Sequence, residues 1–149
     1  MSEDAGGAAS AAGHPRAVLV DLDGTLAIRQ GRSPFDWDMV ATDAANTAVI
    51  AVVQALADAG FAIIVVSGRD VVCREDSAQW LRDNLQRPFT LYMRASGDNR
   101  RDEVVKREMW ETHIRNTHAV SMAFDDRDRC VALWRSLGIP TLQVADGDF

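Results

Sequence analysis

The chain has 149 residues, of which 47% are hydrophobic and 26% charged, the composition of one ordinary globular domain with a real core. Its net charge of −6 argues against nucleic-acid binding by long-range attraction, which depends on cationic side chains, although it leaves local contact open. No apolar run approaches the roughly eighteen residues that span a bilayer, so we expect a soluble, cytoplasmic protein. The two cysteines are far apart in the sequence, which argues against a disulfide framework or a zinc site.

The chain begins with a segment, residues 1–15, that is small, polar and glycine-rich. This segment has neither the apolar core of a signal peptide nor the basic amphipathic pattern of a transit peptide. We therefore expect a disordered tail there, followed by one folded domain over residues 16–149.

The first apolar run, Ala17–Val20, ends abruptly in Asp21-Leu22-Asp23-Gly24. This pattern is typical of a buried parallel strand that emerges at the carboxyl edge of a sheet, where ligands bind in open α/β folds. Two carboxylates at that edge can divide the work of phosphate transfer. Asp21 would attack phosphorus as the nucleophile, and Asp23 would protonate the leaving oxygen and later activate water. The alternative is a polar turn, which Asp and Gly favour.

A long polar segment, residues 28–45, separates this strand from the first predicted helix. Loops of this length are often lids or substrate-binding elements, and we expect residues 28–45 to form such an element. Its cations and aromatics, Arg29, Arg32, Phe35 and Trp37, can engage a phosphate and stack on a base. The alternative is a packed excursion whose aromatics belong to the core, and the sequence leaves both open.

The next helix is predicted over residues 49–56, where apolar side chains repeat at i, i+3, i+4 and i+7. The second strand, Phe61–Val66, is followed by Ser67-Gly68-Arg69. We expect the strand to give way here to a helix or turn, where a hydroxyl and free backbone amides can cradle a phosphate. The alternative for Ser67 is a simple helix cap.

Lys106 lies early in the helix predicted after the third strand, Phe89–Met93. A cation at this point opposes the helix dipole and so has no purely local reason to be there. An incoming phosphate or an aspartyl phosphate would supply one. The alternative is a lysine that simply faces solvent.

The fourth strand, Ala119–Phe124, ends in the pair Asp125-Asp126. Adjacent like charges are costly unless a cation neutralises them, and hard oxygen ligands that include Asp21 and Asp23 favour Mg²⁺ over zinc. The alternative is an aspartate that caps the following helix, with a second aspartate in its first turn.

The last helix is predicted over Cys130–Leu137, with Cys130 as a core residue, and the last strand over Thr141–Val144. Strands thus alternate with helices along the whole domain. This order implies right-handed crossovers and an α/β fold with a parallel sheet of about five strands, covered by helices on both faces.

These motifs, DLDGT followed by Ser67, Lys106 and Asp125-Asp126, resemble the four motifs of the haloacid dehalogenase superfamily of phosphotransferases. A closer resemblance, over Arg16 to Phe149, is to the 3′-phosphatase domain of phage-type polynucleotide kinase-phosphatases. It is carried by DLDGTLA, GRSPFD, VVSGRD, GDNRRDEVVK, FDDR, LWRSLGI and QVADGDF.

The resemblance implies a Rossmann-like sheet with a small cap, Mg²⁺ as cofactor, and removal of 3′-phosphates from DNA or RNA ends or from nucleotides. It implies that Asp102 orients Lys106, which screens the developing charge, and that Asp126 is the more direct metal ligand of its pair. In full, it assigns catalysis to Asp21, Asp23, Ser67 and Lys106, substrate binding to Arg32, Ser67, Gly68, Arg69, Asp102 and Lys106, and the metal to Asp21, Asp23, Asp125 and Asp126.

The P-loop motif of the kinase that accompanies such phosphatases is absent from this sequence, so we expect no kinase activity. The chain is then a free-standing phosphatase or the partner of a separate kinase or ligase, and it could form a homo-oligomer. Two other functions remain open from the sequence. One is a nucleotidase that acts on free nucleoside monophosphates, and the other is a domain that binds phosphorylated ends or a partner without turnover.

Overall fold

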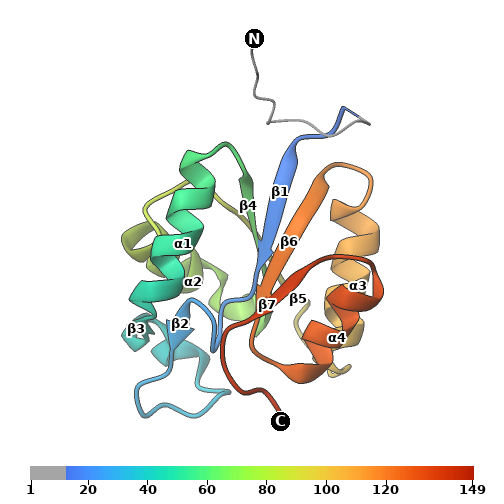
Figure 1. The fold of residues 1–149 in the computed structure, drawn as a ribbon. Coiled ribbons are helices and arrows are strands. Elements are labelled where there is room, and N and C mark those ends of the chain that lie inside the picture. Colours follow the sequence, from blue (N-terminus) through green and yellow to red (C-terminus); the bar gives the residue numbers. More distant parts are fainter. Residues whose placement is uncertain (1–12) are drawn as a thin grey trace.

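The centre of the molecule is a five-stranded parallel sheet in the order β5-β4-β1-β6-β7 (Figure 1). This computed structural model describes residues 13–149, and residues 1–12 of the predicted tail lie outside that range. Just after them, the Pro15 carbonyl accepts a hydrogen bond from the Ala119 amide at 2.9 Å. The strands are β1 (Arg16–Val20), β4 (Ala62–Asp70), β5 (Thr90–Arg94), β6 (Ala119–Asp125) and β7 (Thr141–Gln143). The predicted α/β fold is confirmed.

Helices cover both faces of the sheet, with α1 and α2 on one side and α3 and α4 on the other (Figure 1). Their bounds are α1 (Thr47–Asp58), α2 (Arg74–Asn84), α3 (Asp102–Met109) and α4 (Asp128–Ser136). A π-helical turn, Trp110–Ile114, continues α3. The helices predicted from the apolar spacing of residues 49–56 and 130–137 are therefore present as α1 and α4.

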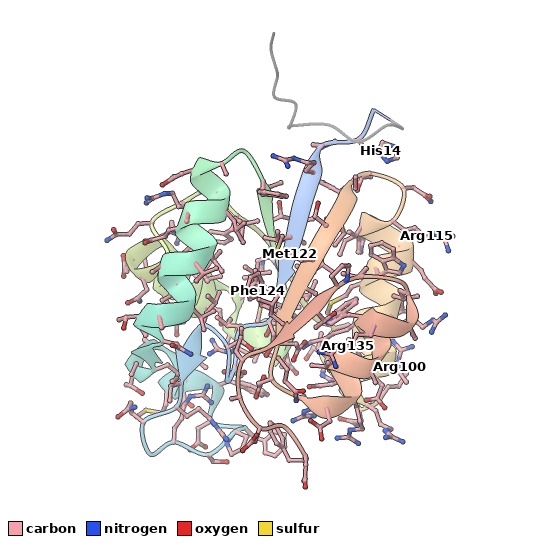
Figure 2. The ribbon with its side chains drawn as sticks, in the orientation of Figure 1. His14, Arg100, Arg115, Met122, Phe124 and Arg135 are labelled. Carbon is pink, nitrogen blue, oxygen red and sulfur yellow. The ribbon has the colours of Figure 1, made fainter. Side chains whose placement is uncertain are left out.

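Side-chain alternation along β1 builds one core on each face of the sheet. Val18 and Val20 pack with the buried residues of α1 and α2, whereas Ala17 and Leu19 pack with those of α3 and α4. Phe124 of β6, labelled in Figure 2, belongs to the first of these clusters. A strand buried on both faces requires the continuous apolar run that the sequence has at this point.

Strand β4 extends further than the sequence predicted. We expected the strand to end at Val66, but it runs on to Asp70, which pairs with Arg94 of β5. The pairing register shifts between Val66 and Asp70, so polar residues are accommodated without ending the strand. The cap of the following turn is Asp70, whose carboxylate accepts from the Val72 amide at 2.8 Å. Ser67 lies inside β4, so the alternative in which Ser67 caps a helix is wrong, as is the expectation that the strand gives way at Ser67.

The polar segment of residues 28–45 folds back on itself. Its ends form a short antiparallel pair, β2 (Ala27–Ile28) with β3 (Ala44–Ala45), and a 3₁₀ helix, Trp37–Thr42, lies between them. Within this segment Val40 is fully buried, whereas Phe35 is 77% exposed. The interpretation that places both aromatics in the core is therefore wrong for Phe35.

Both cysteines are buried within the described part of the chain. Burial raises the pKa of the Cys130 thiol to about 12, and burial also raises the pKa of Cys73. These thiols are small core groups, as predicted for Cys130. Within residues 13–149 no helix has the length and apolar character needed to cross a bilayer.

Candidate active site

A pocket of about 1010 Å³ opens at the carboxyl edge of the sheet. Six parts of the chain line it, and most of their pocket-facing residues are charged. They are Asp21–Gly24, residues 28–37, Gly68–Asp70, residues 94–106, Asp125–Arg129 and Phe149. Residues that are distant in the sequence therefore meet in one cavity, as the parallel topology predicts.

The turn after β1 brings the first carboxylate into this pocket. The Asp21 amide continues the sheet by donating to the Phe124 carbonyl at 2.9 Å, and the chain then turns sharply at Gly24, which has a φ of +80°. A Cβ at Gly24 would overlap the Asp126 carboxylate. Glycine is thus required twice over, for the left-handed backbone and for the close approach of Asp126.

Lys106 joins the two strand ends that carry acids. Its Nζ donates to Oδ1 of Asp21 at 2.7 Å and to Oδ2 of Asp125 at 3.0 Å, and only 1% of the side chain is exposed. The alternative of a lysine that simply faces solvent is wrong. The ammonium lies on α3 opposite two aspartates, which explains a cation at this helical position.

The two adjacent aspartates after β6 have different surroundings. Asp125 is fully buried and already bound on both oxygens, since Oδ1 accepts from the amides of Asp126 and Arg127 and Oδ2 accepts from Lys106 and the Trp134 indole. The Asp126 carboxylate lies instead against the Thr25 hydroxyl, at 3.3 Å, and against Asp21. Both aspartates line the pocket, but Asp126 is the member of the pair that keeps unused acceptor capacity there.

Charge is unbalanced in this group, which we call the Lys106 cluster: Asp21, Asp125, Asp126 and Lys106. Burial raises the pKa of Asp21 well above its usual range, and Asp125 adds to the shift. Burial also raises the pKa of Asp126. Burial alone would lower the pKa of Lys106, but Asp125 and Asp21 outweigh it and the pKa is raised. Three carboxylates facing one ammonium leave an excess of negative charge in a desolvated site.

That excess fits a hard divalent cation. One oxygen from each of Asp21, Asp125 and Asp126 lies within 4.8 Å of the others, and all three residues are buried. A donor set made only of carboxylate oxygens suits Mg²⁺ rather than zinc. Asp23, which the sequence placed with these ligands, is not part of this group among the described residues.

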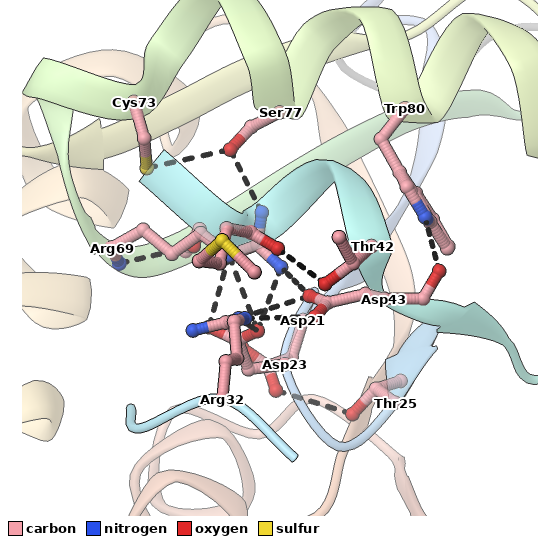
Figure 3. A network of polar contacts seen from close by, with 12 residues as sticks. Asp21, Asp23, Thr25, Arg32, Thr42, Asp43, Arg69, Cys73, Ser77 and Trp80 are labelled. Carbon is pink, nitrogen blue, oxygen red and sulfur yellow. Dashed lines mark hydrogen bonds and ion pairs between the residues drawn. The ribbon is translucent and has the colours of Figure 1, made fainter. Parts of the chain in front are cut away.

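Asp23 lies instead in a second group, which we call the arginine cluster: Asp23, Asp43, Arg32 and Arg69 (Figure 3). Arg69 binds Asp23 at 2.8 Å and Asp43 at 2.7 Å, and Arg32 binds Asp43 at 2.8 Å and Asp23 at 3.3 Å. Two guanidiniums face two carboxylates, so this group is neutral in sum. Only Asp23 reaches outward, with 38% of its side chain exposed.

Sequence reasoning missed Asp43. Its side chain is fully buried and accepts hydrogen bonds from both arginines, while its carbonyl accepts from the Trp80 indole at 2.9 Å. The Arg69 guanidinium also donates a hydrogen bond to the Ser77 hydroxyl at 2.8 Å, as Figure 3 shows. Asp43 carried no motif in the polar segment before α1, because its partners Arg32 and Arg69 are 11 and 26 residues away.

The remaining predicted site residues separate into those inside and those beside the pocket. Gly68 lines it, and its carbonyl accepts from Arg94 at 2.8 Å. Ser67 is buried but is absent from the lining of the pocket within residues 13–149, and its hydroxyl accepts from the Arg69 amide at 3.1 Å. The Ser67 hydroxyl therefore orders the strand that carries Arg69.

Asp102 has different partners from the one predicted. Its carboxylate pairs with Arg94 at 2.5 Å and with Arg127 at 3.2 Å. Among the described residues the Nζ partners of Lys106 are Asp21 and Asp125, and Asp102 acts on Lys106 only through its charge, which helps to raise the pKa of the lysine. Asp102, at the start of α3, thus links the end of β5 with the loop after β6.

Comparison with known proteins identifies relatives that share this fold and sequence. Residues 15–149 match the family model described as the polynucleotide kinase PNKP phosphatase domain. A protein of Autographa californica nuclear polyhedrosis virus, named as a bifunctional polynucleotide kinase/RNA ligase, is 41% identical over 131 residues. That match covers 86% of this chain and 19% of the viral protein.

Two solved structures are similar over most of the chain. A chain in the structure of a Pnkp1/Rnl/Hen1 complex has a TM-score of 0.86 and 36% identity, and the match covers 91% of this chain and 48% of that one. A chain in the structure of the Pnkp1/Rnl/Hen1 RNA repair complex has a TM-score of 0.89 and 34% identity, with 95% and 45% covered. This chain thus spans less than half the length of each relative.

The family match and the site geometry agree. The family model covers all but the first two of the residues that the structure describes, and the acids and the lysine of the Lys106 cluster meet at the carboxyl edge of the sheet. The chain therefore belongs to the family of polynucleotide kinase PNKP phosphatase domains.

Proposed function

We propose that this domain is a Mg²⁺-dependent phosphatase that removes 3′-phosphates from polynucleotide ends through an aspartyl-phosphate intermediate. The observation that carries the proposal is the Lys106 cluster, in which a buried carboxylate, Asp21, faces the pocket beside a lysine and a second pocket-facing acid. Family membership supports the same chemistry. The position of the phosphate on the nucleotide and the identity of the metal are parts of the proposal.

In the first step an Asp21 carboxylate oxygen attacks phosphorus, and the bond from phosphorus to the leaving 3′-oxygen breaks. The Lys106 ammonium, 2.7 Å from Oδ1 of Asp21, screens the negative charge that develops on the phosphoryl oxygens. When bound, Mg²⁺ would be held by Asp21 and Asp126 and would reduce the repulsion between the carboxylate and the phosphate dianion.

Asp23 moves the protons in both steps. It gives a proton to the departing 3′-oxygen, and it later takes a proton from the water that hydrolyses the phosphoaspartate and releases inorganic phosphate. Arg32 and Arg69 fix the Asp23 carboxylate at the mouth of the pocket. The substrate's phosphate oxygens would compete for the Arg32 and Arg69 guanidiniums, which fits the predicted contact of both residues with substrate.

The wall of the pocket suits a nucleotide chain. Phe35 and Trp37, within residues 28–45, meet edge to face, with ring centroids 6.1 Å apart, and both line the pocket. Cationic side chains of residues between Arg94 and Arg129 also line the pocket. We propose that the aromatics stack on the terminal base while the cations contact neighbouring phosphates, which a domain of net negative charge achieves only locally.

A separate kinase or ligase is the partner that we propose for this chain. The solved relatives come from Pnkp1/Rnl/Hen1 complexes, and the viral relative is named as a kinase and RNA ligase. Removal of a 3′-phosphate yields the 3′-hydroxyl that a ligase needs as its nucleophile. The proposed reaction therefore prepares an end for joining.

The test is phosphate release from a 3′-phosphorylated oligonucleotide, with Mg²⁺ or with EDTA, by the wild type and by Asp21→Asn. We expect metal-dependent release by the wild type and a loss of at least about 10³-fold in the variant, because an amide cannot attack phosphorus. Faster hydrolysis of 5′-mononucleotides would favour a nucleotidase. Absence of turnover by folded wild type, even on a simple aryl phosphate, would favour a binding role.

A further inference from the structure

Residues 143–149, which we call the C-terminal strap, cross directly over the loop that carries Asp126. The Val144 amide donates to the Asp125 carbonyl at 3.1 Å, and the Gln143 side-chain amide donates to the Asp126 carbonyl at 3.0 Å. Both carbonyls of the acidic pair are thus bound by this one segment. In Figure 1 the segment passes from β7 to the end of the sheet at which α4 begins.

The strap also fixes the start of α4. The Gly147 carbonyl accepts from the Asp128 amide at 2.8 Å, and Gln143 donates a second hydrogen bond to the Asp128 carboxylate at 2.6 Å. The loop between β6 and α4 is therefore held on both sides of Asp126. Backbone amides at the first turn of a helix have no partner within the helix, so the strap supplies one.

Gly147 allows the approach. It is buried, and a Cβ at this position would overlap the Asp126 carbonyl oxygen and crowd the backbone of Arg127. These neighbours are backbone atoms that cannot rotate away. Because Gly147 does not have a positive φ, the reason for glycine here is contact with the acidic loop rather than backbone conformation.

The end of the strap reaches the pocket itself. The Phe149 ring lies 4.7 Å from the Arg127 guanidinium carbon, and the Phe149 carbonyl accepts from Arg129 at 3.1 Å. Phe149 and both arginines line the pocket. The strap thus contacts two parts of the site, the backbone of Asp126 and the cations beside it.

We propose that the C-terminal strap sets the position of Asp126, and that Gly147 and Gln143 are positioning residues for the divalent cation. The proposal rests on the function proposed above only in assuming a cation at the Lys106 cluster. Residues that orient a metal ligand without touching the metal commonly change its affinity by about 10–100-fold when they are replaced. No ligand atom comes from the strap itself.

The experiment measures Mn²⁺ binding directly, from the electron paramagnetic resonance signal of free Mn²⁺ titrated with metal-free protein and no substrate. We expect Gly147→Ala to weaken binding about tenfold. Gly60→Ala is the matched control, because Gly60 has a φ of +101° and no neighbour within 4 Å, so alanine strains the backbone away from the site. We expect this control to lower the melting temperature and keep wild-type Mn²⁺ affinity.

Gln143→Ala is the second variant, since it removes two side-chain hydrogen bonds at an exposed position and adds no overlap. We expect a several-fold weaker Mn²⁺ affinity with an unchanged fold. If Gly147→Ala does not fold, Gln143→Ala decides alone. Wild-type affinity in the folded variants would overturn the proposal. Wild type that binds Mn²⁺ but releases no phosphate would instead overturn the proposed function and leave the role of the strap intact.

Discussion

The two charged clusters of the pocket both combine aspartates with basic side chains, but they differ in net charge. The Lys106 cluster sets three carboxylates against one ammonium, and the arginine cluster sets two carboxylates against two guanidiniums. The Lys106 cluster is incomplete, because it lacks enough positive charge to balance its carboxylates. The arginine cluster is complete, because its charges balance. An incomplete buried cluster attracts a ligand cation, whereas a complete one holds its members in place.

This difference in net charge suggests separate roles for the two aspartates in the turn after β1. Asp21 and Asp23 are two residues apart, yet Asp21 belongs to the first cluster and Asp23 to the second. We infer that the metal acts on the nucleophile and that the arginines act on the residue that moves protons. Variants that affect one cluster should therefore leave the other measurably intact.

Asp23→Asn is expected to give the largest difference between loss of turnover and loss of stabilisation by Mg²⁺. Loss of a proton-transfer group should lower kcat by about 10²–10⁴-fold, because an amide can neither give nor take the proton. The rise in melting temperature that we expect from Mg²⁺ should remain, since Asp23 lies outside the group of carboxylates proposed to hold the cation. Thermal unfolding with Mg²⁺ and with EDTA, beside turnover, measures both.

The counterpart is Asp126→Asn, in which we expect the Mg²⁺-induced rise in melting temperature to shrink. If instead the Asp23 variant lost that rise and the Asp126 variant kept it, our assignment of the clusters would be reversed. That outcome would restore Asp23 as a side-chain ligand of the metal, as the sequence suggested.

Asp43→Asn tests the complete cluster. Removing one carboxylate leaves two buried guanidiniums with a single acid, so we expect the free energy of unfolding to fall by about 3 kcal/mol. Denaturant titration measures the loss. Asp58→Asn is the control, because Asp58 forms an exposed ion pair with Arg87 and should change stability little. Equal effects of the two variants would contradict a structural role for the arginine cluster.

The excess of carboxylates in the Lys106 cluster should make the stabilisation of the fold by Mg²⁺ depend on pH. The pKa values of Asp21 and Asp126 are raised above 3.8 in the folded, metal-free protein. The stability that they contribute is complete below that value and is lost as the pH rises through the raised pKa values. Binding of Mg²⁺ needs the ionised carboxylates, so the stabilisation that Mg²⁺ provides increases as the pH rises.

We therefore expect the difference in melting temperature between Mg²⁺ and EDTA to be small near about pH 4 and larger near about pH 8. Taking the difference at each pH cancels the contributions of other carboxylates. A difference that did not change with pH would mean that the Lys106 cluster does not take up the metal as proposed.

The smallest effect is expected at the aromatic wall. Trp37→Ala should raise KM for a 3′-phosphorylated oligonucleotide by about tenfold, because stacking of one base contributes about 1–3 kcal/mol. Hydrolysis of an aryl phosphate, which has no base, should be unchanged. Val72→Ala is the control, as Val72 is 70% exposed and lies outside the lining of the pocket among the described residues. An equal rise in KM for both substrates would contradict stacking.

The sequence predicted the sheet and the Lys106 cluster because both are recorded in local patterns. Apolar runs mark strands that are buried on both faces, and acids at the ends of β1 and β6 must meet at one edge. Lys106 was conspicuous because the sequence placed it early in a helix, whereas the structure places it in the last turn of α3, where a cation suits the helix dipole. Each of these signals needs only a few adjacent residues.

The arginine cluster could not be predicted in the same way. Asp43 is identified by its contacts with Arg32 and Arg69, which depend on how residues 28–45 fold back and on how far β4 continues. The sequence ended that strand at Val66, since polar residues usually signal its end. Tertiary pairing with β5 overrode that preference.

The site is assembled from strands that are far apart in the sequence, and this affects when it forms. The Thr25 hydroxyl and the Asp126 carboxylate are 101 residues apart, and they meet only after β6 has docked beside β1. A chain emerging from the ribosome carries its nucleophile early and lacks the opposing acid until most of the domain has been made. Phosphatase turnover should thus appear late in refolding, after the central strands have paired, and serve as a reporter of the complete sheet.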